Sequence, residues 1–451
     1  MFRLLAALGN AFKIPELRKR ILFTLGIIAV YEVGIFIPAP GIDGKALGQI
    51  FDMIAKNTGG GLLNLLDMFT GGALSHATIF ALGIMPYISA TIIVETLLAT
   101  VIPAFVRWRK EGMAGYRRLH QVSRYVTILL AVVNSFVYAM ILERGIPAQF
   151  GREIVQFPGW GFRLLTVITM TSGMAFIMWL AEQITERGIG NGMSLLMTVS
   201  IVGRIPLAVR DLFASLSVFK ESSQLTPLKL AAMGCLFVSA VVFVIFIEQA
   251  QRRVPVQYAR RMMGRKIYGG QTTYLPLKVN SGGVLPIIFA VSVLAFPGQV
   301  ASFFPKLNTW ATHLTRTTWL FNVLYAGLIV FFAYFSMAIT SHGILEMADN
   351  MKKSGAFIPG IRQGESTVSH LDFILVRITF VGALYLVTVA ILPDLLMAQL
   401  HIPPRVAGFF GGTSLLIVVG VMLDTMKQIE SHLLMRHYEG FMKRGQLRGR
   451  R

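Results

Sequence analysis

Ten apolar stretches alternate with polar segments along this chain. Each is about 17 to 25 residues long, and a helix of that length can cross the ~30 Å hydrocarbon core of a bilayer. The stretches are 21–37, 77–101, 122–142, 162–184, 193–212, 228–247, 282–304, 320–339, 373–392 and 408–426. This pattern predicts an all-α polytopic membrane protein with ten transmembrane helices.

The region 62–101 is broken in an unusual way. Its first part, 62–69, would rise only about 12 Å as a helix and cannot cross a bilayer alone. Gly71 and Gly72 then interrupt it, and glycine pairs allow the chain to change direction. Irregular backbone at membrane depth is stable only against protein or a water-filled cavity. The break therefore indicates a path through the membrane, with a re-entrant or surface helix of structural role as the alternative.

A full-length helix is expected to follow this break. Ser75 is placed to cap a helix over 77–101. Pro86 falls inside that helix, where proline removes a hydrogen bond, so we expect a kink there. Ile84 and Ile88 are four residues apart and would share one face beside the kink.

Composition supports a membrane protein without a bound metal. Of the 451 residues 54% are hydrophobic and 14% are charged, against about 25% charged in soluble domains. The net charge of +20 is typical of basic cytoplasmic loops, and it also favours anionic lipids or an RNA-bearing partner. The single cysteine, Cys235, excludes a disulfide within the chain, and the eight histidines show no metal-ligand spacing. We expect no metal and no cofactor.

Positive charge gathers in alternate loops, which predicts the orientation in the membrane. The basic clusters lie within 13–20, 107–124, 252–278, 352–362 and 443–451. The positive-inside rule places these clusters and both termini in the cytoplasm. The segment 1–20 does not resemble a cleavable signal and is expected to lie as an amphipathic helix on the cytoplasmic membrane surface. Residues 427–451 are expected to form a basic cytoplasmic tail.

Two cytoplasmic loops carry more pattern than topology requires. The loop 251–280 alternates β-branched and aromatic residues with polar ones on both sides of Gly264, which predicts a projecting hairpin. Within the loop 343–371, the glycines and proline of 352–367 predict an ordered turn with Arg362 near its tip. The alternative for both loops is that their charges serve orientation alone.

The chain lacks the motifs of an enzyme or an ion-coupled carrier. No GxSxG, HExxH, GxxxxGK[ST] or paired-carboxylate pattern occurs, so we expect no catalytic residues. A coupled carrier places ionisable residues mid-span, whereas of the acidic candidates Glu32, Glu95, Glu182 and Asp424 only Glu95 lies deep in a predicted span. A solute carrier of the inner membrane remains the second hypothesis, and a membrane hydrolase the third.

Several long runs resemble a known family. They are MFTGGALSHATIFALGIMPYISATII from Met68, ITERGIGNG from Ile184, LPLKVNSGGVLPIIFA from Leu275, KKSGAFIPGIRQGE from Lys352 and GGTSLLIVVGVMLDT from Gly411. In these runs the chain resembles the SecY/Sec61α family, the central channel subunits of the Sec protein translocase. The matches extend over nearly the whole chain.

The resemblance implies an hourglass-shaped pore between two pseudo-symmetric five-helix halves. The halves would be 21–213 and 228–426, joined by a connecting loop at 214–227. Such a channel passes unfolded secretory polypeptides across the bacterial plasma membrane and releases membrane segments through a lateral gate beside spans two, three, seven and eight. The implied partners are the SecE and SecG subunits, the SecA motor ATPase, the ribosome, precursors with signal peptides, and anionic lipids.

The resemblance also assigns roles to residues. The apolar ring at the waist of the pore falls on Ile84, Ile88, Met193, Met197, Ile288 and Ile417. Methionine replaces the usual isoleucine at two of these positions, and its adaptability predicts a softer seal. The plug falls on 62–74, with Leu62, Leu63, Leu65, Leu66, Met68, Phe69, Gly71 and Gly72. Motor or ribosome binding falls on Arg265, Lys266 and Arg362.

Overall fold

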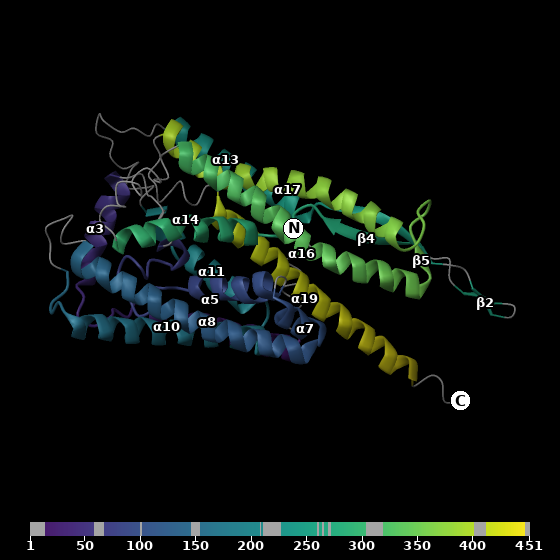
Figure 1. Cartoon of the computed structure of the whole chain (residues 1–451), viewed down its shortest axis with the longest axis horizontal. Coiled ribbons are helices and arrows are strands. Elements are labelled where there is room, and N and C mark those ends of the chain that lie inside the picture. Colours follow the sequence, from purple (N-terminus) through teal and green to yellow (C-terminus); the bar gives the residue numbers. More distant parts are fainter. Residues whose placement is uncertain are drawn as a thin grey trace.

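Helices form most of the described part of the chain, and Figure 1 shows them in two groups. The computed structural model describes residues 14–57, 67–99, 102–145, 154–207, 209–210, 227–258, 261–263, 266–268, 272–303, 319–400 and 412–446. The helices of the first half are α2 (Pro15–Ile35), α3 (Gly44–Asn57), α5 (Met85–Thr91), the π-helix η1 (Ile92–Leu98), α7 (Pro103–Lys110), α8 (Met113–Met140), the π-helix η2 (Ile141–Gly145), α10 (Trp160–Arg187) and α11 (Gly192–Gly203). Those of the second half are α13 (Pro227–Gln249), α14 (Leu285–Phe303), α16 (Trp319–Ser354), α17 (Glu365–Leu400) and α19 (Thr413–Gln446).

Each group is built from helices that are neighbours in the sequence. In the first, α8 packs against α10 and α5, and α10 packs against α2 and α11. In the second, α16 packs against α14 and α17. Contacts between α11 and α19 join the two groups, and Figure 1 shows α19 and α14 running between them. The two groups therefore meet through helices of both halves of the chain, with α11 against α19 and α8 against α14.

Length and hydropathy single out four described helical segments that can each cross a membrane. They are Met113–Arg144, Trp160–Arg187, Trp319–Ala338 and Glu365–Leu392, which coincide with predicted spans three, four, eight and nine. Shorter apolar helices lie at predicted spans two, five, six and seven. Helices α2 and α19 cover the first and last predicted spans. The chain is thus a helical polytopic protein, while the count of ten spans stays a prediction.

The second predicted span starts later than the sequence indicated. The expected helix from residue 77 is wrong, because residues 70–84 form turns with a β-bridge between Thr78 and Pro38, and α5 begins only at Met85. Ala77 (φ +46°) and Gly83 (φ +57°) adopt left-handed backbone, which an α-helix cannot include. Pro86 consequently lies in the first turn of α5, where its missing N–H costs no hydrogen bond, and not at a kink within a longer helix.

The predicted hairpin at 251–280 is present. Strand β1 (Gln251–Tyr258) pairs antiparallel with β4 (Thr272–Lys278), and β1 also pairs with β5 (Ala356–Phe357) from the loop between α16 and α17. The short strands β2 (Arg261–Met263) and β3 (Lys266–Tyr268) pair with each other further along the hairpin. Val254, Val256 and Ile344 are buried together at the base, so the two cytoplasmic loops predicted from the sequence form one small structure (Figure 1).

Candidate functional site

The six residues assigned to an apolar ring come together in one hydrophobic cluster. Five of them are buried, namely Ile84, Ile88, Met197, Ile288 and Ile417, and Met193 is partly buried against them. They come from four elements far apart in the sequence: the start of α5, α11, α14 and the start of α19. Both helix groups therefore contribute apolar side chains to one buried cluster.

A close backbone contact positions the first of these residues. Gly83 packs so tightly on Thr70 that a Cβ atom there would lie 2.7 Å from Thr70 Cγ2. The left-handed conformation of Gly83 then turns the chain into α5, and Ile88 donates its N–H to the carbonyl of Ile84 at 3.1 Å. Ile84 is 2% exposed, so the abrupt start of α5 directs this side chain into the cluster.

The two methionines are positioned by the junction between α10 and α11. Asn191 caps α11 by accepting hydrogen bonds from the N–H groups of Met193 and Ser194. A Cβ at Gly192 would lie 1.8 Å from the carbonyl oxygen of Ala181, so only glycine fits between the helices. Gly190 donates its N–H to Gln428 Oε1 of α19 at 2.9 Å. The start of α11 is thereby fixed against both halves of the chain.

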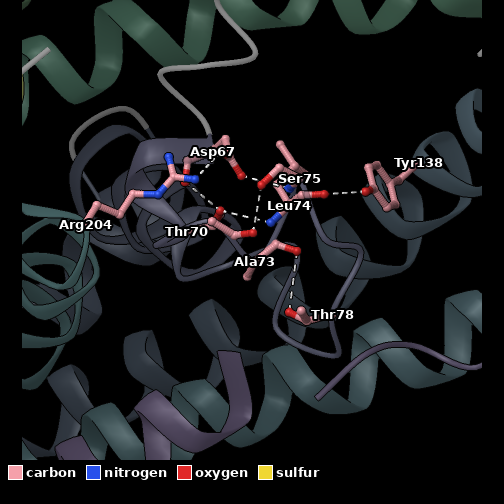
Figure 2. A network of polar contacts seen from close by, with 9 residues as sticks. Asp67, Thr70, Ala73, Leu74, Ser75, Thr78, Tyr138 and Arg204 are labelled. Carbon is pink, nitrogen blue, oxygen red and sulfur yellow. Dashed lines mark hydrogen bonds and ion pairs between the residues drawn. The ribbon is translucent and has the colours of Figure 1, made fainter. Parts of the chain in front are cut away.

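Next to the cluster lies a polar network in the segment Asp67–Ser75, which we term the turn segment (Figure 2). Asp67 accepts a hydrogen bond from the Ser75 N–H at 2.8 Å, which closes the segment into a compact loop. Thr70 donates to the Asp67 carbonyl at 3.0 Å, and Ser75 donates to the Gly72 carbonyl at 3.0 Å. These hydrogen bonds satisfy polar groups that are buried next to the apolar cluster.

Two side chains from other helices tie the turn segment down. Arg204, at the C-terminal end of α11, forms an ion pair with Asp67 at 2.5 Å, and Tyr138 of α8 donates to the Leu74 carbonyl at 2.6 Å (Figure 2). Phe69 is 1% exposed and belongs to the same hydrophobic cluster as the ring residues. The turn segment thus places the Phe69 side chain in the cluster, and contacts from α8 and α11 hold the segment there.

Only part of the predicted plug can be compared with the structure. Leu62, Leu63, Leu65 and Leu66 lie outside the described residues. Met68 and Phe69 are buried, and Gly71 (φ +68°) and Gly72 (φ +92°) pack against Ser200 and Arg204 of the α11 region. A Cβ at Gly72 would lie 2.8 Å from Arg204 Nη2. The two glycines therefore lie close to α11, and their left-handed backbone turns the chain there.

The predicted partner-binding residues lie away from the cluster. Arg265 is outside the described residues, and Lys266 is in strand β3 near the end of the hairpin. Arg362 is exposed in the turn after β5, as the sequence predicted. This turn is ordered by hydrogen bonds from Thr367 Oγ1 to the Arg362 carbonyl (2.9 Å) and from Gln363 Nε2 to the Ala356 carbonyl (3.0 Å). The structure brings this turn and the hairpin together through β5 and β1.

Sequence reasoning missed Asp67, Tyr138 and Arg204. A signal was available, because an acid and a base each lie within or beside an apolar run, and such charges are expected to be paired. The sequence did not show which residues would be the partners of these side chains. In the part of the chain that the structure describes, no group of three or more His, Cys, Asp or Glu side chains is suited to hold a metal ion.

The fold and the apolar cluster define a class: a polytopic α-helical membrane protein whose two helix groups meet at a buried hydrophobic cluster. The SecY family model matches residues 78–426. The chain is 45% identical to the protein translocase subunit SecY of Streptomyces scabiei, over 98% of this chain and all of that relative, and 41% identical to that of Escherichia coli K12, over 96% of each. This chain belongs to the SecY family.

Solved structures show the same fold at lower sequence identity. One described as a protein conducting channel has a TM-score of 0.63 at 14% identity, covering 94% of this chain and 96% of that one. A second, of a SecY protein whose plug domain is said to stabilise the closed channel, has a TM-score of 0.61 at 16% identity with the same coverage. The arrangement of the helices is therefore shared with protein-conducting channels.

Proposed function

We propose that this protein is the central subunit of a channel that passes unfolded secretory polypeptides across a membrane and releases membrane segments sideways into the lipid. The observation that carries this proposal is the apolar cluster, where Ile84, Ile88, Met197, Ile288 and Ile417 from both halves meet. An apolar neck opposes ions because they lose hydration there, while an extended polypeptide can push through. The solute-carrier hypothesis finds no support among the relatives compared.

The plug and the ten-span topology belong to this proposal. Residues 62–74 would close the neck from one side, and the halves 21–213 and 228–426 would separate at a lateral gate. Support comes from Phe69, which already lies in the cluster, and from the joining of the two helix groups through α11 and α19. Closure would then be redundant, because the ring and the plug each block the neck.

The partners and the orientation are also proposed. Both termini and the loop 251–280 would be cytoplasmic in a bacterial plasma membrane, as the one-sided loop charges indicate. SecE and SecG would complete the channel, and SecA or a ribosome would push the precursor, because the sequence has no nucleotide-binding motif of its own. Solved structures of similar fold are described with bound ribosomes, and anionic lipids would suit the basic loops.

Reconstitution tests the function directly. The protein is incorporated into vesicles with SecE and SecG, and a secretory precursor, SecA and ATP are added outside. We expect precursor to become protected from protease in an ATP-dependent manner and only when its signal peptide is intact. Protection that does not depend on ATP, or uptake of a small solute without partners, would contradict the proposal.

A further inference from the structure

The ion pair between Asp67 and Arg204 connects the turn segment to α11 (Figure 2). The Asp67 side chain is 5% exposed and that of Arg204 is 20% exposed, so the pair is largely withdrawn from water. One carboxylate oxygen faces Arg204 and the other accepts the Ser75 N–H. A single carboxylate therefore both folds the turn segment and anchors it to a helix 137 residues further along the chain.

This anchor lies next to the apolar cluster, which a polypeptide would have to cross in the proposed channel. Phe69 follows Asp67 by two residues in the same short helical turn, and it is buried in the cluster with Ile84, Ile88 and Met197. A passing chain must displace Phe69 from the cluster. Asp67 is only two residues from Phe69, so the anchor at Asp67 limits how far Phe69 can move out of the cluster.

Breaking the pair has a discrete cost. Separating two buried opposite charges leaves each without its partner unless water or new hydrogen bonds reach it. The hydrophobic contacts of the ring, in contrast, can adjust gradually through side-chain rotation. Opening therefore meets a step that is all or none, and the energy for that step must come from whatever engages the channel first.

We propose that the Asp67–Arg204 ion pair is a latch that sets how strong a signal segment a precursor must present before the channel opens. This inference rests on the proposed function. Asp67 and Arg204 are positioning residues, since they act by holding Phe69 in the apolar cluster. The latch selects precursors: a strong signal segment supplies enough binding energy to release it, and a weak one does not.

The test uses three variants of the reconstituted channel. Asp67→Asn keeps an oxygen for the Ser75 N–H and removes only the ion pair. Arg204→Met removes the other partner. The double variant Asp67→Asn/Arg204→Met leaves no unpaired charge buried, and replacing both partners of a buried pair is often neutral for stability. The double variant therefore carries the test if a single variant fails to insert.

The matched control is a second buried ion pair. Arg163 of α10 binds Glu143 of η2 through two hydrogen bonds of 2.6 and 3.1 Å, with side chains 10% and 9% exposed. The control variant Glu143→Gln/Arg163→Met removes a pair of similar burial that does not contact the turn segment.

The measurement is a ratio: ATP-dependent protection of a precursor with a crippled signal peptide, divided by protection of the same precursor with an intact one. We expect the ratio to rise at least about tenfold in the latch variants and to stay at the parent value in the control. The double variant should not exceed the larger single variant, because both changes break one contact. Resting ion conductance in planar bilayers should also rise in the latch variants and stay at the parent value in the control.

Two outcomes would overturn the inference, and they separate it from the proposed function. If the parent channel translocates intact precursor and the ratio is unchanged in all latch variants, or rises equally in the control, the pair is only structural. If the parent itself translocates no precursor with its partners and ATP present, the proposed function fails, and the latch fails with it.

Discussion

The turn segment and the apolar ring lie side by side, yet they are held by different physics. In the turn segment, Asp67, Thr70 and Ser75 make directional hydrogen bonds, and Arg204 adds an ion pair. The ring side chains pack in a hydrophobic cluster, and apolar contacts are non-directional and tolerate rearrangement. The polar network depends on the positions of its donors and acceptors, whereas the packing of the ring depends mainly on the apolar area that it buries.

This difference suggests that the ring and the turn segment have separate roles in the proposed closed channel. In the proposed channel, a ring of apolar side chains would exclude ions without binding a particular polypeptide sequence. Such packing does not by itself define a distinct closed state that must be broken before the channel opens. The polar network supplies such a state, because buried hydrogen bonds and charges are costly to leave unpaired. The following predictions test this division, ordered by their expected effect on the ion seal.

The largest effect should come from making the ring polar. Changing Ile84, Ile88, Met193 and Met197 together to Asn places amides where apolar contacts were, and an unpaired buried amide costs about 1–3 kcal/mol. We expect resting ion conductance to rise at least about tenfold in planar bilayers, which corresponds to ~1.4 kcal/mol in the barrier. The apolar control Met193→Ile/Met197→Ile should not leak more than the parent. A fourfold variant as ion-tight as the parent would show that these residues do not form the constriction.

A smaller leak should follow from separating the turn segment from α5. Gly83→Ala would place a Cβ 2.7 Å from Thr70 Cγ2 in addition to the strain of a left-handed alanine. Such strain costs roughly 1–3 kcal/mol. The control is Gly283→Ala, which has nearly the same φ (+58° against +57°) but nothing within 4 Å of the new Cβ.

Thermal unfolding and bilayer conductance measure this pair of variants. Both alanines should lower the melting temperature, and only Gly83→Ala should raise ion conductance. Equal conductance in the two variants would mean that the contact with Thr70 does not support the seal.

Removing one hydrogen bond from the turn segment should have a mild effect. Tyr138→Phe deletes the 2.6 Å bond to the Leu74 carbonyl, which still accepts the Ala77 N–H at 3.2 Å. A typical hydrogen bond contributes about 1 kcal/mol, so the melting temperature should fall slightly and conductance should rise less than in Asp67→Asn. The control Tyr125→Phe lies on the same helix with an exposed ring. A Tyr138→Phe channel that leaks more than Asp67→Asn would reverse the proposed ranking of the two anchors.

No effect on the seal is expected from the cytoplasmic turn. Arg362→Glu reverses a charge on an exposed turn that is not part of the cluster, so the protein should insert normally and remain ion-tight. Repulsion of an acidic or phosphate-bearing partner should reduce motor-driven translocation. Lys353→Glu, an exposed reversal in the last turn of α16, is the control. Unchanged SecA ATPase activity and translocation in Arg362→Glu would remove this turn from the partner surface.

Local patterns in the sequence were sufficient for several features. Runs of apolar residues predicted the four long helical segments that can cross a membrane, since length and hydropathy are properties of a single segment. The hairpin at 251–280 and the exposed Arg362 turn followed from strand alternation and from glycine and proline positions. The ring residues were identified by resemblance, and the structure places them in one cluster, although their role in the pore stays a proposal.

Tertiary structure alone decided how the region before α5 folds and what holds it. A capping serine and an apolar run favoured a helix from residue 77, but Gly83 meets Thr70 and Ala77 adopts left-handed backbone, so the helix begins at Met85. The partner of Asp67 is Arg204, which lies on another helix. Helix and strand periodicity depends on neighbours a few residues apart, whereas ion pairing depends on which helices pack together, and one sequence does not contain that information in its local pattern.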